Sequence, residues 1–292
     1  MNEKRLLIFG MGFSAVAIGR RSQSEFTSIM GTSRSSEKIA ALQAEGFNAS
    51  LFDGEALTTE LAEYMQEVTH VVVSIAPGEA DPVLACLPKP LRELCPRLQW
   101  VGYLSTVGVY GNHDGQWVNE KTETKPVSKR SIQRVIAEAA WQTECDRAEC
   151  PLAIFRLSGI YGPGRNAFTT IEKGRSRRLI KPGQVFNRIH RDDIAEAVFL
   201  ALRDTVPGIF NITDNEPAPP QDVITYAHEL MGTDPPAEID FETADISPMA
   251  RSFYGENKRV SNAKSKRVLG MEYKWPDYHT SLKRMWQEKL WA

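Results

Sequence analysis

Short apolar runs alternate with more polar, helix-like stretches along the first 160 residues of the chain. Apolar β-type runs occur at 5–9, 26–34, 47–53, 69–77, 98–111 and 152–164. Helices are expected between them, up to about Arg21 and then at about 36–45, 57–66, 82–94 and 128–148. Strands that alternate with helices predict βαβ units and an α/β, doubly wound parallel sheet. Right-handed crossovers then place a ligand on one rim, outside the carboxyl ends of the strands.

The pattern changes after Gly164. Residues 165–189 are polar and rich in Arg and Gly. Helices are expected at 190–204, 220–232 and 278–291, a strand at 208–214, and a Pro-rich linker or excursion at about 233–250. The acidic start of the first of these helices suits a helix N-terminus, and Gly232 suits a helix end.

The composition is that of an ordinary globular protein, with 292 residues, 42% hydrophobic and 25% charged. A net charge of −2 gives no bulk field for nucleic acid or an anionic membrane, so neither is expected as a partner. The apolar runs are too short to cross a membrane, and no secretory signal is evident. Cys86, Cys95, Cys145 and Cys150 lie apart with no CxxC pair, which favours free thiols, a cytoplasmic location and no metal site.

The sequence GMGFSA at 10–15 directly follows the first apolar run and fits the pattern G-x-G-x-x-A. Gly10 permits a tight turn, Gly12 lets the backbone approach a pyrophosphate, and Ala15 permits close packing of helix and strand. Because a helix N-terminus favours an anion, these three residues together with Phe13 and Ser14 are assigned to a dinucleotide site.

The residues after the second strand favour NADP, although NAD stays open as the cofactor. An NAD site usually presents Asp or Glu here to bond the ribose 2′-hydroxyl, and the first acid is Glu37. Arg34, helped by Ser33 and Ser35, could instead meet a 2′-phosphate; a solvated arginine is the alternative. The same cofactor site is expected to include Asp53, as an adenine contact or only a turn residue, and Ser74, Ile75 and Ala76 at the end of the strand at 69–77.

Five motifs occur in one order along nearly the whole chain: GMGFSA at 10–15, YLSTVGVYG at 103–111, RLSGIYGPGR at 156–165, IHRDDIAEAV at 189–198 and FNITD at 210–214. Together they resemble an extended short-chain dehydrogenase/reductase of the nucleotide-sugar epimerase/dehydratase type, and above all its atypical members described as predicted nucleoside-diphosphate-sugar epimerases. The resemblance implies a Rossmann domain with a smaller C-terminal α/β substrate subdomain. It places residues 1–164 and about 188–214 in the first, and about 165–187 and 215–292 in the second.

Typical members of that family use a Ser/Thr–Tyr–Lys set, in which the Tyr is the acid/base and the Lys bonds the nicotinamide ribose. The resemblance assigns the first position to Thr106, with Ser105 beside it. Arg130 and Arg134 occupy the Tyr and Lys positions and share one helix face. Arg134 could replace the lysine as a cation. Arg130 cannot replace the tyrosine, because the pKa of its guanidinium lies above about 12.

The proton donor therefore stays open at the level of sequence. The alternatives are Tyr110 and Tyr161, both in loops on the cofactor rim, Tyr254 of the Tyr-x-x-x-Lys match that ends at Lys258, and water. Each tyrosine could equally be a packing aromatic with a bonded hydroxyl. His190, Asp192 and Asp193 are expected to cap and fix a helix rather than to catalyse.

The segment KGRSRR at 173–178 holds four cations, in the part of the chain where relatives bind a sugar-nucleotide diphosphate. Arg177 and Arg178, with Arg165 and Tyr161, are therefore expected at the substrate site, since Arg can grip a phosphate with two hydrogen bonds. A solvated basic loop is the alternative.

The leading hypothesis is an NADP-dependent enzyme, a monomer or homodimer, that oxidises, reduces or epimerises a hydroxyl or carbonyl of a phosphorylated or nucleotide-linked small molecule. Two alternatives stay open. One is a non-catalytic NADP-binding sensor or scaffold that has lost the tyrosine, and the other is a carrier that binds a phosphate-bearing ligand through 173–178.

Overall fold

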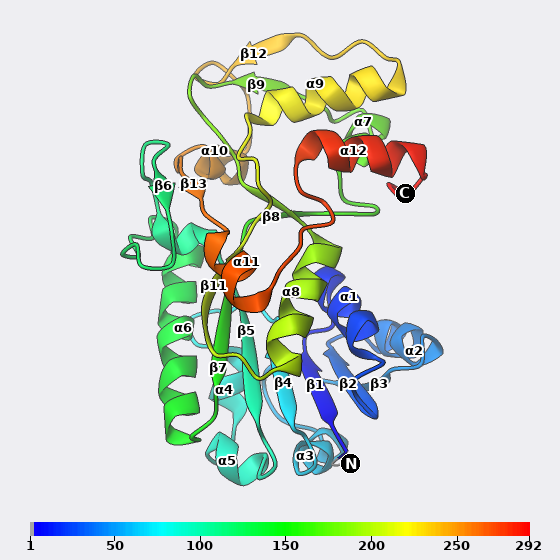
Figure 1. Ribbon diagram of the computed structural model, residues 1–292, viewed down its shortest axis with the longest axis vertical. Helices are drawn as coiled ribbons and strands as arrows, with labels where there is room; N and C mark the ends of the chain where they lie inside the picture. The colour runs from blue at the N-terminus through cyan, green and yellow to red at the C-terminus, as the bar shows by residue number, and fades with distance from the viewer. Residues whose placement is uncertain (1–2) are drawn as a thin grey trace.

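The computed structural model describes residues 3–292 and shows a Rossmann layer beneath a smaller group of helices and short strands (Figure 1). In this part of the chain, seven parallel strands form the main sheet in the order β11-β7-β5-β4-β1-β2-β3. They are β1 Arg5–Phe9, β2 Ser28–Ser33, β3 Asn48–Leu51, β4 His70–Val73, β5 Trp100–Thr106, β7 Leu152–Leu157 and β11 Gly208–Ile212. The predicted doubly wound α/β sheet with a smaller C-terminal part is confirmed.

The side chains of β1 alternate between the two faces of the sheet, because successive residues of a strand point to opposite sides. Leu6 and Ile8 belong to one core cluster, whereas Leu7 and Phe9 belong to another. Helices α1 (Phe13–Ser22), α2 (Ser36–Ala44) and α8 (Arg191–Arg203) cover the first face, and α3 (Thr59–Met65), α4 (Pro82–Cys86), α5 (Leu91–Leu94) and α6 (Lys129–Arg147) cover the second. A sheet buried on both faces explains why its strands are nearly uniform apolar runs.

The helix expected at 82–94 is in fact the two short helices α4 and α5. Pro88 and Pro90 lie between them, and Leu87 is extended, with φ −68° and ψ 119°. A proline disfavours helical backbone in the preceding residue and lacks an N–H donor, so the helix cannot continue through this pair.

A smaller group of elements lies above the carboxyl ends of the main sheet (Figure 1). Its helices α7 (Ala167–Glu172), α9 (Pro220–Met231) and α12 (Tyr278–Gln287) pack around Phe168 and Leu282. The expected linker at 233–250 contains β12 (Glu238–Asp240), which pairs in parallel with β9 (Arg178–Ile180), and the start of α10 (Pro248–Phe253). All three β12 residues are exposed, so no apolar alternation reveals this strand.

The last part of the chain returns to the Rossmann layer. Helix α11 (Ala263–Leu269) packs on α8 and β11, and Leu269 and Met271 join the core on that face of the sheet. The division that assigns 165–187 and 215–292 to a substrate subdomain stays a prediction. Helix α11 belongs to the second of these ranges but packs on the Rossmann layer.

Two short parallel pairs join the crossing segments above β5 and β7. Strand β8 (Gly159–Tyr161) pairs with β10 (Arg188–His190), and β6 (Trp117–Val118) pairs with β13 (Arg259–Val260). None of the helices between residues 3 and 292 is both long and apolar enough to cross a bilayer.

Candidate active site

The glycine turn after β1 lies between β4 and β2, where the strand order of the sheet reverses. Gly10 has a φ of +82°, and a Cβ there would lie 2.6 Å from Ile75 Cγ1 in the turn after β4, so only glycine fits. Gly12 is the N-cap of α1. No side chain of residues 3–292 caps the first turn of this helix, and the first turn contains no acidic residue. The open N–H groups of Phe13, Ser14 and Ala15 therefore suit an anion such as a pyrophosphate.

Arg34 follows β2 with an exposed side chain, and no hydrogen bond or ion pair within residues 3–292 holds its guanidinium. Ser35 Oγ accepts from Lys38 N at 3.3 Å and caps α2, while Ser35 N donates to Ser33 Oγ at 3.3 Å. Both serine hydroxyls only accept in these bonds, so their O–H groups stay available beside the Arg34 guanidinium for a 2′-phosphate.

Two other residues expected at the cofactor rim are placed by their turns. Asp53 is exposed, and its Oδ1 accepts from Glu55 N at 2.9 Å, which is the turn role that the sequence left open. Ser74 N donates to Phe9 O at 2.9 Å and so extends the pairing of β1 and β4 by one residue. This pairing brings Ile75 against Gly10.

A cavity of about 880 Å³ lies between the carboxyl ends of β5 and β7 and the smaller group of elements. It begins at Ala76 and Pro77, next to the glycine turn, and extends past Thr106 to α9, α10 and α12. Within residues 3–292, its titratable lining residues are Arg130, Arg134, Arg165, Arg177, Arg188, Lys258, Glu256, Tyr161, Tyr254 and Tyr278. Six cations and one carboxylate favour an anionic ligand.

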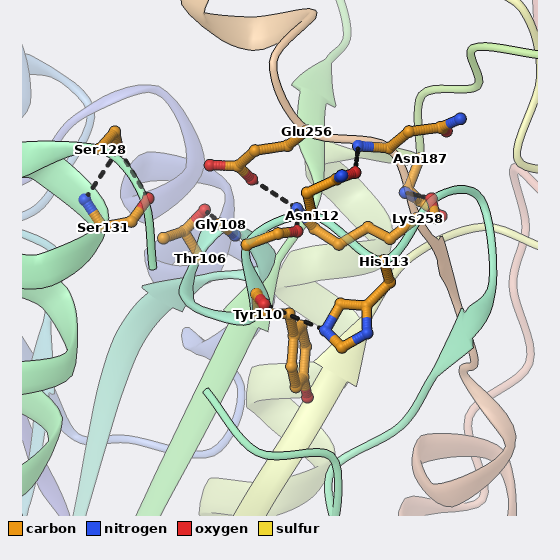
Figure 2. Close-up of polar contacts among 12 residues, drawn as sticks. Thr106, Gly108, Tyr110, Asn112, His113, Ser128, Ser131, Asn187, Glu256 and Lys258 are labelled. Atoms are coloured by element: carbon orange, nitrogen blue, oxygen red, sulfur yellow. Dashed lines mark hydrogen bonds and ion pairs between the residues drawn. The ribbon is translucent and has the colours of Figure 1, made fainter. Parts of the chain in front are cut away.

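Thr106 ends β5 and lines the cavity. Its Oγ1 accepts from Gly108 N at 3.1 Å, so its own O–H stays available as a donor. A Cβ on Gly108 would lie 2.6 Å from Ser131 Oγ and 3.4 Å from Thr106 Oγ1, so both hydroxyls lie close to Gly108. Figure 2 shows the three residues together. Ser131 Oγ accepts from Ser128 Oγ at 2.9 Å. Thr106 and Ser131 therefore bring two hydroxyl donors to one end of the cavity.

Arg130 and Arg134 both line the cavity from α6. Arg134 is half-buried, and its Nη1 donates to Leu104 O and, at 3.2 Å, to the Tyr103 hydroxyl. Arg130 is exposed, and its guanidinium lies 4.8 Å from the centre of the Phe253 ring. The position where the motifs predict a tyrosine therefore presents an arginine to the cavity.

The far side of the cavity carries three more arginines, Arg165, Arg177 and Arg188. Arg177 is exposed and donates to Asp245 O at 2.8 Å, which leaves other N–H groups for a ligand. The Tyr161 hydroxyl is buried and has no partner among residues 3–292, and burial raises the pKa of Tyr161. This side therefore suits a phosphate or carboxylate.

Comparison with known proteins supports the assignment that the motifs suggest. The model of the NAD dependent epimerase/dehydratase family matches residues 87–213. A solved structure from Silicibacter pomeroyi, described as a functionally unknown conserved protein, is 43% identical, with 99% of this chain and 100% of that chain covered and a TM-score of 0.88. The chain belongs to the NAD-dependent epimerase/dehydratase family.

Two better-described proteins are more distant. UDP-glucuronic acid 4-epimerase from Bacillus cereus, solved with NAD, is 18% identical, with 97% of this chain and 96% of that chain covered and a TM-score of 0.74, a likeness of fold. Human dTDP-D-glucose 4,6-dehydratase is 26% identical over 186 residues, which is 59% of this chain and 51% of that protein. The match therefore spans about half the length of this curated relative.

Ser105 and Tyr110, both expected at the family's catalytic site, lie in a buried network instead of on the cavity. Ser105 Oγ donates to Glu138 Oε1 at 2.5 Å, and Glu138 forms an ion pair with Arg156 at 2.7 Å. Arg156 Nη1 donates to the Tyr110 hydroxyl at 3.1 Å, and this hydroxyl donates to Asn211 Oδ1 at 2.7 Å. Burial raises the pKa of Tyr110. Ser105 points away from the cavity because it is the neighbour of Thr106 in a strand.

Arg178, expected at the substrate site, lies outside the cavity. In β9 its Nη2 donates to Glu238 Oε1 at 2.7 Å, and it does not line the cavity, whereas its neighbour Arg177 does. The bond to Glu238 and the pairing of β9 with β12 hold Arg178 on the outer strands, so the basic run places only Arg177 of this pair at the cavity.

The sequence reasoning missed several cavity residues. Ser128 and Ser131 surround the expected tyrosine position but match no family motif. Glu256 lies inside the Tyr254–Lys258 match, but the sequence pattern gives it no role. Arg188 lies in a short strand with no characteristic spacing. A group outside the cavity, Glu216, Asp277 and His279, brings its ligand atoms within 4.8 Å of one another, but His279 is 52% exposed and pairs with Glu216, and we assign no metal there.

His190 and Asp193 connect α8 to the C-terminal part. His190 Nδ1 accepts from Asp192 N at 3.2 Å, and its ring stacks on Trp275 at 4.0 Å. Asp193 is fully buried and accepts from Lys274 N and Trp275 N, each at 3.0 Å. These contacts explain both residues without catalysis.

Asp193→Asn should remove a pH-dependent part of the stability. Burial raises the pKa of Asp193 from 3.8 to about 6. The folded state therefore binds this proton more tightly than the unfolded state. The stabilisation that the protonated Asp193 contributes is full below about pH 4 and is lost as pH rises through about 6. The difference in unfolding free energy between wild type and variant should fall across this window in urea titrations. A difference that stays flat across this window would contradict this assignment.

Proposed function

We propose that this protein is an NADP-dependent enzyme that oxidises, reduces or epimerises at a hydroxyl or carbonyl of a phosphorylated or nucleotide-linked substrate. The observation that carries the proposal is the cavity that joins the glycine turn, the Thr106 hydroxyl and six cationic side chains. Thr106 would hold the reacting oxygen, and the arginines of the far side would hold the anionic group.

The dinucleotide fits the rim formed by the turns after β1, β2 and β4. The N–H groups at the start of α1 would hold the pyrophosphate, Arg34 a 2′-phosphate and Arg134 the nicotinamide ribose. When bound, the dinucleotide supplies the exchange of a hydride with the substrate carbon. NADP over NAD follows from the free guanidinium of Arg34 and is tested by comparing the dissociation constants of the two cofactors.

A second candidate is a non-catalytic NADP-binding sensor or scaffold. The observation in its favour is Arg130, which lines the cavity where the family places its acid. Tight NADP binding without turnover would support it, and restoration of turnover by Arg130→Tyr with Arg134→Lys would show which group was lost. Binding of UDP without any binding of NADP would instead favour a ligand carrier.

The test of the proposed enzyme is Thr106→Val, assayed with NADP⁺ or NAD⁺ and a panel that includes UDP-glucuronic acid, dTDP-glucose and sugar phosphates. Reduced nicotinamide and sugar products would be measured by absorbance and NMR. We expect turnover to fall about 10²–10³-fold, because one donor to the reacting oxygen is lost, while NADP⁺ affinity is retained. Thr143→Val on the exposed side of α6 is the control. Wild type without turnover on the whole panel would overturn the proposal.

A further inference from the structure

Glu256 is the single carboxylate among the residues of 3–292 that line the cavity. It faces the same space as Thr106, Ser131 and Arg130. The family position for an acid is occupied by a guanidinium that cannot cycle a proton, so any proton exchanged in the cavity must pass through another group.

The backbone around Glu256 is held from two sides. Gln184 Nε2 donates to Glu256 O at 2.8 Å, and Asn187 Nδ2 donates to Lys258 O at 2.9 Å. Between them, Asn257 N donates to Asn112 Oδ1 at 2.8 Å. These bonds fix a segment without regular secondary structure, so its side chains keep defined positions in the cavity wall.

The carboxylate has one engaged and one open oxygen. Lys258 Nζ donates to Glu256 Oε2 at 2.5 Å and to Gly111 O at 2.8 Å. The side chain of Glu256 is 15% exposed and that of Lys258 is 6% exposed. Glu256 Oε1 has no hydrogen-bond partner within the described chain. Gly111 ends the turn that begins at Thr106, so the pair is fixed to the loop of the reacting hydroxyl. In Figure 2 the carboxylate extends toward the side where Thr106, Ser128 and Ser131 lie.

The tyrosines of the cavity are poorer candidates. Tyr254 stacks on Phe241 at 4.7 Å and meets Phe186 edge-on, and burial raises the pKa of Tyr254. Burial also raises the pKa of Tyr161. A phenol must lose its own proton before it can act as a base, whereas a carboxylate accepts one directly.

We propose that Glu256, positioned by Lys258, exchanges the proton with a substrate oxygen held by Thr106 and Ser131. The inference rests on the proposed function. In the oxidising direction the substrate O–H bond breaks and its proton passes to Glu256 Oε1. The electron pair left on the oxygen becomes the second bond of the carbonyl as the hydride leaves the carbon for the dinucleotide. In the reducing direction Glu256 returns the proton to that oxygen.

The test compares Glu256→Gln, Glu256→Asp and the exposed control Glu242→Gln, with the panel substrate that wild type turns over. We expect Glu256→Gln to lose turnover about 10²–10⁴-fold with NADP⁺ affinity retained, and Glu256→Asp to keep part of it. Added formate should restore turnover to Glu256→Ala several-fold. Lys258→Met should also lower turnover with NADP⁺ affinity retained, because it removes the donor that positions the Glu256 carboxylate, and Lys258→Arg should recover part of the turnover.

A readout independent of turnover is the ¹³C NMR titration of labelled glutamate carboxyls in the NADP⁺ complex. One titrating signal should vanish in Glu256→Gln, persist in Glu242→Gln and shift when UDP-glucuronic acid is added. Wild-type turnover that Glu256→Gln retains with the same pH profile would overturn this inference alone. Absence of wild-type turnover on the whole panel would overturn it together with the proposed function.

Discussion

Replacing Glu138 by alanine is expected to lower the free energy of unfolding by about 3–5 kcal/mol. Glu138 and Arg156 form a buried ion pair, with their side chains 8% and 5% exposed. Removing the carboxylate leaves the Arg156 guanidinium in the core without its counter-charge, and it also leaves Ser105 Oγ without its acceptor. Urea unfolding followed by circular dichroism measures the change.

The control for Glu138 is Glu63→Ala, which removes an exposed carboxylate from α3 and should change stability by less than about 1 kcal/mol. The double variant Glu138→Leu with Arg156→Met should be more stable than Glu138→Ala, because it removes both charges. A loss below about 1 kcal/mol for Glu138→Ala would show that the pair does not hold α6 to β7.

Gly111→Ala is expected to cost about 3 kcal/mol or more. Gly111 has φ 72° and ψ −149°, a region that L side chains avoid, and a Cβ would lie 1.9 Å from the backbone oxygen of Lys125. Since a backbone atom cannot rotate away, the loop must move, and it carries both Thr106 and the acceptor of Lys258. Urea unfolding and protease sensitivity of this loop measure the effect.

Gly232→Ala separates the cost of backbone strain from the cost of the steric contact. Gly232 also has a positive φ of 68°, but nothing lies within 4 Å of the position that a Cβ would take, so alanine there should cost about 1–2 kcal/mol from backbone strain alone. Equal losses for the two glycines would mean that the contact with Lys125 does not matter.

The Rossmann layer could be predicted because its signals are local. The apolar run of β1, the positive-φ glycine after it and the small residue of α1 follow one another within 15 residues. The two-residue period of strands could also have separated Thr106 from Ser105, which are neighbours in β5. The sequence reasoning grouped this pair because it considered residue type without strand direction.

The segment of the cavity wall that carries Glu256 and Lys258 could not be predicted in the same way. Glu256 and Lys258 reach the cavity because Asn112, Gln184 and Asn187 hold their backbone, and none of these contacts leaves a periodic trace. Counting along the sequence placed Arg130 and Arg134 on one face of a helix, and both line the cavity. The residues that face them across the cavity come from distant segments of the chain, which the sequence does not reveal.

The contact between Lys258 and Gly111 joins positions 147 residues apart in the chain. Closing a loop of that length costs more entropy than forming the βαβ units, which use near neighbours. The sheet and its glycine turn should therefore form early in folding, and the wall that carries Glu256 should close late and open first. Amide hydrogen exchange would show this as weaker protection at 256–260 than in β1 and β4. A newly made chain would then gain the glycine turn of the Rossmann layer before it gains a completed cavity.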